Sequence, residues 1–335
     1  MRNTVKTFLF ALSGEDLGGM PADEALAVIR TETDGAFSDV ETGPGWLRAT
    51  FDESHLEHVC SRLALTKEVG ELLCTFNPED YSAVNGVTLP EGTFAVRTYR
   101  FEGRMKDVDS QKLTRAVGQI LSKSNDVDLK NPEITVRLLM SDVCHLYVLR
   151  FETEAGPMRA RKVSERPFFS PISLHPKYAR AIINLTGVKR GGAVLDPFCG
   201  TGGIVIEAAS MGMRAYASDF DPEMVDGTLE NMDYFGLDIA GYEVADVKDI
   251  PSLFPEMNAV VCDPPYGRAT KTGGETIRAI YDKAAEAIPK ILAQGGKTGI
   301  VLPYEYESPF LVKEACYTQY VHGTLNRYYH VFHPS

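Results

Sequence analysis

Long apolar runs are missing from this sequence, and both cysteine and tryptophan are scarce. No hydrophobic stretch approaches the roughly 20 residues that a membrane-spanning helix requires. The apolar start at residues 5–12 is too short, and too soon followed by polar residues, to be a secretion signal. No two of the six cysteines lie close enough in the sequence for a zinc knuckle or a redox pair. We therefore expect a cytoplasmic protein with reduced thiols, no metal site and no membrane segment.

An excess of positive charge is also missing. The chain has 34 Lys and Arg against 46 Asp and Glu, a net charge of −12, which argues against a generally basic nucleic-acid binder. Residues 156–190 differ, because they carry eight basic residues against one acid, Glu165, and so a local net charge of +7. An acidic protein can still present one basic face to phosphates. An acidic background of the whole proteome would give the same total, and the sequence does not separate the two.

Two short segments carry most of the chemistry that the sequence indicates. The first, residues 196–203, reads Asp-Pro-Phe-Cys-Gly-Thr-Gly-Gly and lies between an apolar run at 193–195 and a helical stretch at 204–209. The second, residues 263–266, reads Asp-Pro-Pro-Tyr and follows an apolar run at 259–262. Both segments therefore lie at the carboxyl end of a predicted strand, which is where open α/β sheets bind their ligands.

The residue types in each segment indicate what it can bind. The glycines of the first allow a tight turn and close approach of a ligand, and the helix that follows offers free N–H groups to an anion. In the second, Pro264 and Pro265 fix a rigid turn and leave carbonyls as acceptors. Together with the carboxylate of Asp263 and the flat ring of Tyr266, these acceptors suit a planar ring that carries an amino group.

The order of the predicted elements divides the chain into two halves. Residues 4–76 show a β-α-β-β-α-β pattern with Gly43-Pro44-Gly45 as a hairpin turn, which is typical of a ferredoxin-like module. Residues 77–92 have the composition of a linker, and a second α+β piece with a helix over 108–123 follows. From residue 165 onward, strands alternate with helices, which predicts a doubly wound parallel α/β sheet closed by a terminal hairpin. In this half we predict helices over 176–185, 203–211, 222–234, 275–293 and 308–315, and strands over 192–195, 214–218, 240–244, 258–262, 297–302, 317–324 and 327–333.

The two segments together resemble those of amino-group methyltransferases that use S-adenosylmethionine. The chain is most similar to THUMP-containing tRNA guanosine-N2 methyltransferases, specifically the archaeal enzyme of tRNA position 10. The similarity continues in Arg166-Pro167-Phe168-Phe169, Ser173, Pro176, Ala179-Arg180 and Arg268-Ala269-Thr270. It implies a Rossmann-like α/β methyltransferase domain preceded by α+β ferredoxin-like and THUMP modules. The implied boundaries are a ferredoxin-like domain at 1–76, a THUMP RNA-binding domain at 77–155, a linker at 156–175 and the methyltransferase domain at 176–335.

The resemblance also implies an activity. The enzyme would transfer methyl from S-adenosylmethionine to the exocyclic N2 amine of a guanosine in tRNA, at position 10, adding one or two methyl groups. It assigns turnover to Asp263, Pro264, Pro265 and Tyr266. Asp263 and the Pro264 carbonyl would accept the N–H groups of the amine, Asp263 or a water beyond it would take the leaving proton, and Tyr266 would stack on the base.

The cofactor is expected to bind along the first segment and the strand ends beside it. Asp219 follows Asp196 by 23 residues, close to the spacing at which an acid binds ribose hydroxyls in dinucleotide folds, although capping of a helix is the alternative. The resemblance assigns Asp196 to the methionyl ammonium and Asp246 with Val247 to the adenine, and a capping role also competes for Asp246. The full predicted cofactor set is Asp196, Pro197, Phe198, Gly200, Thr201, Gly202, Asp219, Asp246, Val247, Phe169 and Ser173.

Contacts to tRNA are predicted from the cations of the N-terminal half, the linker and one loop. For each of them a solvated surface position is the alternative. The predicted set is Arg97, Arg100, Arg115, Arg161 and Arg268. We expect tRNA as the partner, and no protein partner is evident, which fits a monomer.

Other functions stay open on the sequence alone. The same chemistry could act on another tRNA position or on rRNA. A DNA amino-methyltransferase shares the second segment, although such enzymes carry a target-recognition region, whereas the extra half here resembles an RNA module. A non-catalytic RNA-binding protein with this fold is the remaining class, and the intact run from Asp263 to Tyr266 argues against it.

Overall fold

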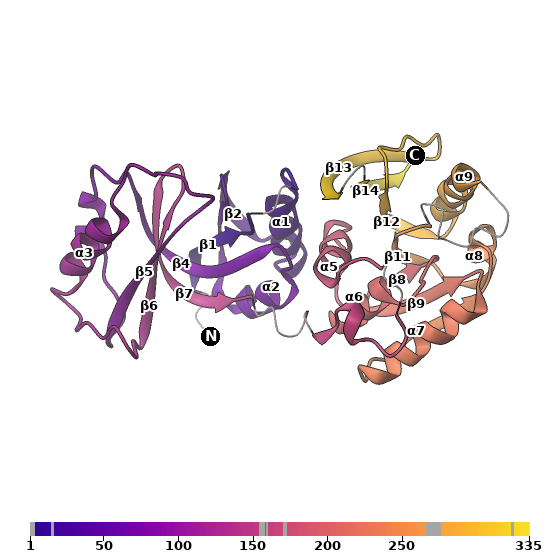
Figure 1. Cartoon of the computed structure of the whole chain (residues 1–335), viewed down its shortest axis with the longest axis horizontal. Helices are drawn as coiled ribbons and strands as arrows, with labels where there is room; N and C mark the ends of the chain where they lie inside the picture. The colour runs from indigo at the N-terminus through magenta and orange to yellow at the C-terminus, as the bar shows by residue number, and fades with distance from the viewer. Residues whose placement is uncertain are drawn as a thin grey trace. The chain divides into compact units, whose positions relative to one another are not determined.

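A seven-stranded sheet organises the first part of the chain (Figure 1). The computed structural model describes residues 4–14, 17–153, 158, 160–169, 173–265, 276–322 and 325–335. The strands of this sheet are β1 (Val5–Leu12), β2 (Phe37–Gly43), β3 (Trp46–Asp52), β4 (Thr66–Phe76), β5 (Phe94–Arg100), β6 (Ile134–Met140) and β7 (Cys144–Glu152). Their order is β2-β3-β1-β4-β7-β6-β5. Neighbours pair antiparallel except β5 and β6, which are parallel and are joined through α3 (Ser110–Leu121).

The first four strands confirm the predicted ferredoxin-like pattern. In the sequence, α1 (Met20–Glu32) follows β1, and η1 (Glu53–His55) with α2 (Leu56–Arg62) follows β3. The strand order β2-β3-β1-β4 is the one that this pattern gives. Gly43-Pro44-Gly45 forms the predicted turn between β2 and β3. The boundaries predicted at residues 76 and 155 stay a prediction, but β4 pairs with β7, so the two predicted modules share one continuous sheet.

The second α+β piece packs around its own core. Asp109 caps α3 by accepting a hydrogen bond from the Lys112 amide, as its sequence position indicates. The apolar face of α3, made by Leu113, Val117 and Leu121, packs against side chains of β5 and β6. Residues 77–92, which have the composition of a linker, contain one short helix, η2 (Ser82–Gly86). Val84 of η2 is part of the same core.

A second seven-stranded sheet carries the predicted methyltransferase fold. Its strands are β8 (Ala193–Asp196), β9 (Arg214–Asp219), β10 (Gly241–Val244), β11 (Met257–Cys262), β12 (Leu292–Leu302), β13 (Leu311–His322) and β14 (Leu325–Pro334). Their order is β10-β9-β8-β11-β12-β14-β13. The five strands from β10 to β12 are parallel, and β14 and β13 add the predicted antiparallel hairpin. The chain moves outward from β8 to β10 and then returns to β11, so the topological switch point lies between β8 and β11.

Helices cover both faces of this sheet (Figure 1). They are α5 (Pro176–Leu185), α6 (Gly203–Ser210), α7 (Pro222–Tyr234), α8 (Ile250–Leu253) and α9 (Ile277–Ala287), with the short turns η3 (Val163–Glu165), η4 (Val247–Asp249) and η5 (Ile288–Lys290). Ile280 and Ala284 of α9 share a core cluster with Ile300 of β12. Ile182 of α5 packs against the neighbouring Gly299, which faces the other way because strand residues alternate between faces.

One predicted helix of this half is too long, and another is wrong. The helix predicted over 275–293 ends at Ala287, because Pro289 cannot donate the backbone bond that would continue it, and β12 begins at Leu292. The helix predicted over 308–315 does not form, and β13 runs from Leu311 to His322 instead. Pairing with β14 along its length outweighs the local helical pattern, and burial alternates along β13 with Leu311 and Tyr317 inside.

The chain forms two compact units, and the second takes in two pieces of the N-terminal half. The first unit contains Thr33–Cys60 and Leu65–Thr153 together with the residues of β1. The second contains Glu154–Ser335 with Asp16–Glu32 and Ser61–Ala64. Helix α1 therefore belongs to the unit that holds the methyltransferase fold. Within the described part of the chain, no helix has the length and apolar character needed to cross a membrane.

Candidate active site

Three aspartates converge at the carboxyl edge of the second sheet. Asp196 is the last residue of β8, Asp219 is the last residue of β9, and Asp263 directly follows β11. Asp196 is buried, and burial raises the pKa of its carboxyl well above its usual range. The negative charges of Asp219 and Asp263 raise it further, whereas the hydrogen bond from the Phe198 amide opposes the shift. The carboxylate of Asp196 is therefore close enough to those of Asp219 and Asp263 to be repelled by both.

This donor set fits the predicted cofactor. Burial also raises the pKa of Asp219, against the hydrogen bonds that it accepts from the amides of Asp221 and Gly200. A cluster of acids in a partly dry site favours a ligand that brings positive charge and hydroxyl groups. S-adenosylmethionine carries an ammonium, a sulfonium and two ribose hydroxyls, and therefore matches the cluster in charge and in hydrogen-bonding groups.

The glycine turn of the first segment is tied to Asp219. The amide of Gly200 donates to Asp219 Oδ2 at 3.1 Å, and the Gly200 carbonyl accepts from Thr228 Oγ1 at 2.9 Å. Gly202 begins α6 in the left-handed region, with φ of +79°, which a residue with a side chain rarely adopts. The predicted order of strand, turn and helix is present.

Side chains join residues 166–169 and Ser173 to this turn. Arg166 Nη1 donates to Thr201 Oγ1 at 3.1 Å, and the hydroxyls of Ser173 and Thr201 lie 2.7 Å apart. Asn231 of α7 accepts from the Phe168 amide and donates to the carbonyls of Phe168 and Thr201, at 3.1, 2.7 and 2.9 Å. The structure therefore brings Ser173 and Thr201 of the predicted cofactor set together.

The two aromatic residues of this segment differ in their surroundings. The Phe168 ring packs on α7 at Gly227, where a Cβ atom would come within 2.0 Å of it, so a larger residue there would displace the ring. Phe169 is 62% exposed. The cofactor role predicted for Phe169 stays a prediction.

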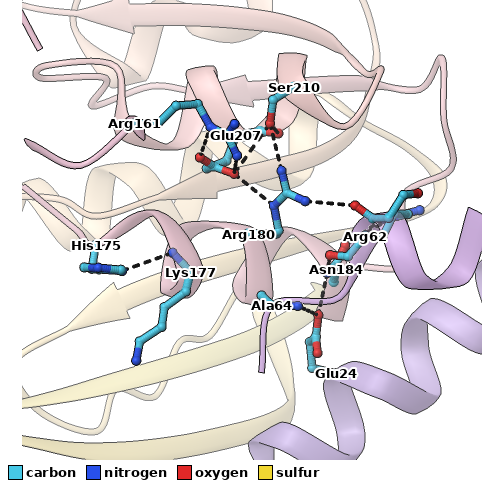
Figure 2. Close-up of polar contacts among 11 residues, drawn as sticks. Glu24, Arg62, Ala64, Arg161, His175, Lys177, Arg180, Asn184, Glu207 and Ser210 are labelled. Carbon is cyan, nitrogen blue, oxygen red and sulfur yellow. Dashed lines mark hydrogen bonds and ion pairs between the residues drawn. The ribbon is translucent and has the colours of Figure 1, made fainter. Parts of the chain in front are cut away.

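A buried acid holds the same segment from the far end of α6 (Figure 2). Glu207 is fully buried and receives two bonds from Arg161, Nε to Oε1 at 2.7 Å and Nη2 to Oε2 at 3.1 Å. Arg180 Nε of α5 donates to Glu207 Oε2 at 2.9 Å. Arg161 was predicted to contact RNA, and the structure instead places it in an ion pair with a buried partner. Its guanidinium is therefore engaged with Glu207, and the RNA contact predicted for Arg161 stays a prediction.

Glu207 and Asn231 are functional-site residues that sequence reasoning missed. Glu207 is the one acid in the apolar stretch 204–209, and a lone charge in such a helix is a signal that it has a buried partner. Asn231 carries no comparable signal, because an asparagine in the polar stretch of a helix is indistinguishable from a surface residue.

Asp246 has two partners. Its Oδ1 accepts from the Lys248 amide and so caps η4, and its Oδ2 pairs with Lys283 of α9 at 2.9 Å. Burial acts to raise the pKa of Asp246, but these bonds outweigh burial and lower it. The capping alternative is thus present, and the neighbouring Val247 is buried. The adenine contact predicted for Asp246 stays a prediction.

Asp221 caps α7, with Pro222 next to it, as the sequence predicts.

The second segment forms a turn beyond the end of β11. The ladder to β12 ends where Cys262 pairs with Ile300, and Pro264 is buried immediately after it. The Pro265 carbonyl accepts a hydrogen bond from the Tyr281 hydroxyl of α9 at 3.1 Å. Tyr266 and Arg268 lie outside the described residues. The structure therefore places the first three predicted catalytic residues at the switch point of the sheet, just beyond the end of β11, the neighbour of the strand that carries Asp196.

The predicted RNA contacts of the first unit are not equivalent. The guanidinium of Arg100 donates to the carbonyls of Arg104, Met105 and Val108 and so holds the chain that follows β5. Arg97 donates to the Leu129 carbonyl. Arg115 is exposed on α3, beside the exposed Lys112. Of the three, Arg115 is the most available to a phosphate, and the role of all three stays a prediction.

Comparison with known proteins places the chain in a family. A family model described as an RMKL-like methyltransferase domain matches residues 164–320, and a THUMP domain model matches residues 67–149. The tRNA (guanine(10)-N2)-dimethyltransferase of Methanothermobacter thermautotrophicus is 32% identical over 95% of this chain and 97% of its own. The enzyme of the same name from Pyrococcus abyssi is 30% identical over 82% of this chain and 85% of its own.

The fold is shared with a solved structure as well. TrmN from Thermus thermophilus has a TM-score of 0.57 and 22% identity, covering 98% of this chain and 100% of that one. The order of domains, the two strand-end segments and the match along nearly the whole length of a curated relative agree with the resemblance drawn from the sequence. The chain belongs to the family of archaeal tRNA (guanine(10)-N2)-dimethyltransferases.

Proposed function

We propose that this protein methylates the exocyclic N2 amine of the guanosine at position 10 of tRNA, using S-adenosylmethionine, and adds two methyl groups. The observation that carries the proposal is the acceptor turn, Asp263-Pro264-Pro265, beside the carboxylates of Asp196 and Asp219 at the switch point of the sheet. The names of the relatives support the position and the dimethyl product, because each is named for N2-dimethylation of guanine 10.

The cofactor, when bound, supplies a methyl group on a positively charged sulfur. Asp196 would hold the ammonium of its methionine, Asp219 would hold the ribose hydroxyls, and the glycine turn would allow the close approach that both contacts require. The repulsion among the acids is then relieved, because a cation is placed among them. Binding of the cofactor should therefore stabilise the folded protein.

The turn acts on the base rather than on the cofactor. The lone pair of the guanine N2 amine is delocalised into the ring, so the amine is a poor nucleophile. Acceptance of its two N–H groups by Asp263 and the Pro264 carbonyl favours a pyramidal nitrogen whose lone pair points at the methyl group. Asp263, or a water beyond it, takes the proton that leaves. Holding the amine in this orientation supplies much of the rate.

The experiment that tests the function is methyl transfer to unmodified tRNA. The protein is incubated with S-adenosylmethionine labelled in the methyl group and with tRNA transcripts that carry guanosine or adenosine at position 10. Nucleoside analysis should give N2,N2-dimethylguanosine from the first transcript, through N2-methylguanosine at short times, and no label from the second. Label in the adenosine transcript would move the reaction to another guanosine. No label in either would refute tRNA as the substrate, and rRNA and then DNA would be tested.

A further inference from the structure

The acceptor turn contains two prolines and accepts a hydrogen bond from a side chain of α9. The β11 ladder ends at Cys262, and neither Pro264 nor Pro265 has an N–H group to donate. Tyr281, sixteen residues further along the chain on α9, donates a hydrogen bond to the Pro265 carbonyl at 3.1 Å.

This bond restrains ψ of Pro265, the one backbone angle of the two prolines that their rings do not restrict. The proline rings fix φ of both residues near −65°, and a residue that precedes a proline is restricted in ψ, which limits Pro264. The remaining soft angle is ψ of Pro265. It sets the direction of the Pro265 carbonyl and of the peptide plane that follows, and the Tyr281 hydroxyl holds that carbonyl.

Tyr281 is itself well fixed. Its side chain is 3% exposed and belongs to the core between α9 and the sheet. Its ring centroid lies 5.9 Å from that of Tyr304 and 6.3 Å from that of Tyr306, the latter in an edge-on arrangement at 85°. Tyr306 is held in turn by a 2.8 Å bond from its hydroxyl to Asp282. The donor is therefore placed by packing on a rigid helix and not by a loop.

We propose that Tyr281 is a positioning residue for methyl transfer, which fixes the acceptor turn through the Pro265 carbonyl. This inference rests on the proposed function. Asp263 and the Pro264 carbonyl have to meet an amine whose lone pair points at the methyl group, and the Tyr281 bond ties the end of their turn to α9, which resists a shift of the whole turn out of that alignment. The Tyr281 hydroxyl contacts the turn at the Pro265 carbonyl, so its loss should slow transfer without weakening cofactor binding.

The test compares Tyr281→Phe with Tyr306→Phe. Each change removes one hydroxyl from a buried ring of the same cluster, but only the first removes the bond to the turn. Single-turnover rates are measured at saturating S-adenosylmethionine and tRNA, with the Kd of S-adenosylhomocysteine and the KM for tRNA measured alongside. Tyr281→Phe should lower the rate about tenfold, as loss of one hydrogen bond allows, and leave both binding constants within about twofold. Tyr306→Phe should stay close to the unchanged protein in all three.

Three outcomes would overturn the inference. The rate of Tyr281→Phe could stay within about twofold of the unchanged protein. Cofactor affinity could fall as much as the rate, which would make the residue part of the cofactor site. Tyr306→Phe could slow transfer equally, which would make the effect a general property of the core. Failure of the proposed function is seen separately, because the unchanged protein would then place no label on guanosine 10 in the same assay.

Discussion

At the scale of single residues, the site divides into two parts that do different work. Asp196 and Asp219 lie at the ends of β8 and β9 and form the charged side that suits a cationic cofactor. Asp263 lies one strand further on, at the start of a turn whose backbone can only accept hydrogen bonds. The two sides meet because β8 and β11 are neighbours in the sheet. Substitutions on the two sides should therefore have separable effects.

Replacement of Asp263 should affect turnover and not cofactor binding. Asp263→Ala removes both the hydrogen-bond acceptor and the proton acceptor, so the single-turnover rate should fall by at least about 100-fold. The Kd of S-adenosylhomocysteine, measured by calorimetry, should change little. Asp263→Asn keeps an acceptor oxygen of the same size and should retain more of the rate than Asp263→Ala. Full activity of Asp263→Ala would remove Asp263 from the mechanism.

Replacement of Asp196 should affect stability in a pH-dependent way. The pKa of this carboxyl is raised in the folded protein, so ionisation of Asp196 opposes folding. The stability that the protonated carboxyl contributes is present at low pH and is lost as pH rises through the folded pKa. Asparagine stays neutral and still accepts the Phe198 amide bond. Without cofactor, Asp196→Asn should be more stable than the unchanged protein above that pKa, by on the order of 1 kcal/mol, and the difference should close as pH falls.

Thermal unfolding from acidic to alkaline pH measures this effect. Asp233→Asn, which changes an exposed acid on α7, is the matched control and should shift the unfolding temperature little at any pH. The same Asp196→Asn protein should bind S-adenosylhomocysteine more weakly, because the ammonium loses its charged partner. A protein that is destabilised equally at every pH would show that the Asp196 carboxylate is not under electrostatic strain.

At the scale of elements, α6 connects the glycine turn to residues 160–169. Its first turn follows Gly202, and its Glu207 binds Arg161 and Arg180 (Figure 2). Asn231 of the neighbouring α7 joins Phe168 to Thr201. The segment 160–169 is thus held at two places by side chains that are buried in the second unit. Loss of either anchor should loosen the segment and the glycine turn together.

Glu207→Gln should be strongly destabilising. It removes the charge that compensates two arginines in a dry site, and breaking one partner of a buried ion pair costs about 3–5 kcal/mol. Glu286→Gln makes the same chemical change in an exposed pair with Lys290 on α9 and η5, where about 0.5 kcal/mol is at stake. Urea unfolding of both variants gives the comparison. Equal and small losses would mean that the Glu207 cluster is solvated in solution.

The elements also show where sequence reasoning reached its limit. The strand-end segments, the capped helices α3, α5 and α7 and the strand order of the ferredoxin-like part follow from local chemistry, because caps, prolines and glycines act within a few residues. That β13 is a strand does not follow from local chemistry, because residues 308–315 have a helical pattern. Residues 311–315 are part of a strand only because they pair with β14. Asn231 and Tyr281 were missed for the same reason: their partners lie far away in the sequence.

At the scale of the whole molecule, a net charge of −12 has to be reconciled with a tRNA substrate. Several cations of the basic stretch 156–190 are used inside the fold, since Arg161 and Arg180 pair with Glu207. The exposed cations of α3 are therefore better candidates for phosphate contacts. Lys112→Gln with Arg115→Gln should weaken tRNA binding and lower the slope of log K against log salt by about 1–2.

A matched pair of exposed cations on the other unit serves as the control for this measurement. Lys248→Gln with Lys290→Gln removes the same charge from the second unit. Filter binding at several salt concentrations gives the slopes. An unchanged slope for the α3 variant, or an equal loss for both variants, would move the RNA footprint away from α3.

The methyltransferase unit is not a contiguous piece of sequence, and this also makes a prediction. Glu24 of α1 accepts hydrogen bonds from the Ala64 amide at 3.0 Å and from Asn184 Nδ2 at 2.6 Å, and Arg62 donates twice to Asn184 Oδ1 at 3.1 and 3.0 Å (Figure 2). All of these side chains are fully buried. A fragment of residues 158–335 keeps Asn184 on α5 but loses every one of these partners.

That fragment should not fold to the state it has in the whole chain. Asn184 would be left without its buried partners, at about 1–3 kcal/mol for each unsatisfied group, and the face of α5 that packs on α1 would be exposed. We expect a broad or absent thermal transition and binding of a hydrophobic dye, against a cooperative transition for the whole chain. Adding Asn184→Leu to the fragment should recover part of its stability, because the polar group that lost its partners is then gone. A fragment that unfolds cooperatively at the temperature of the whole chain would show that α1 and residues 61–64 are dispensable to the methyltransferase fold.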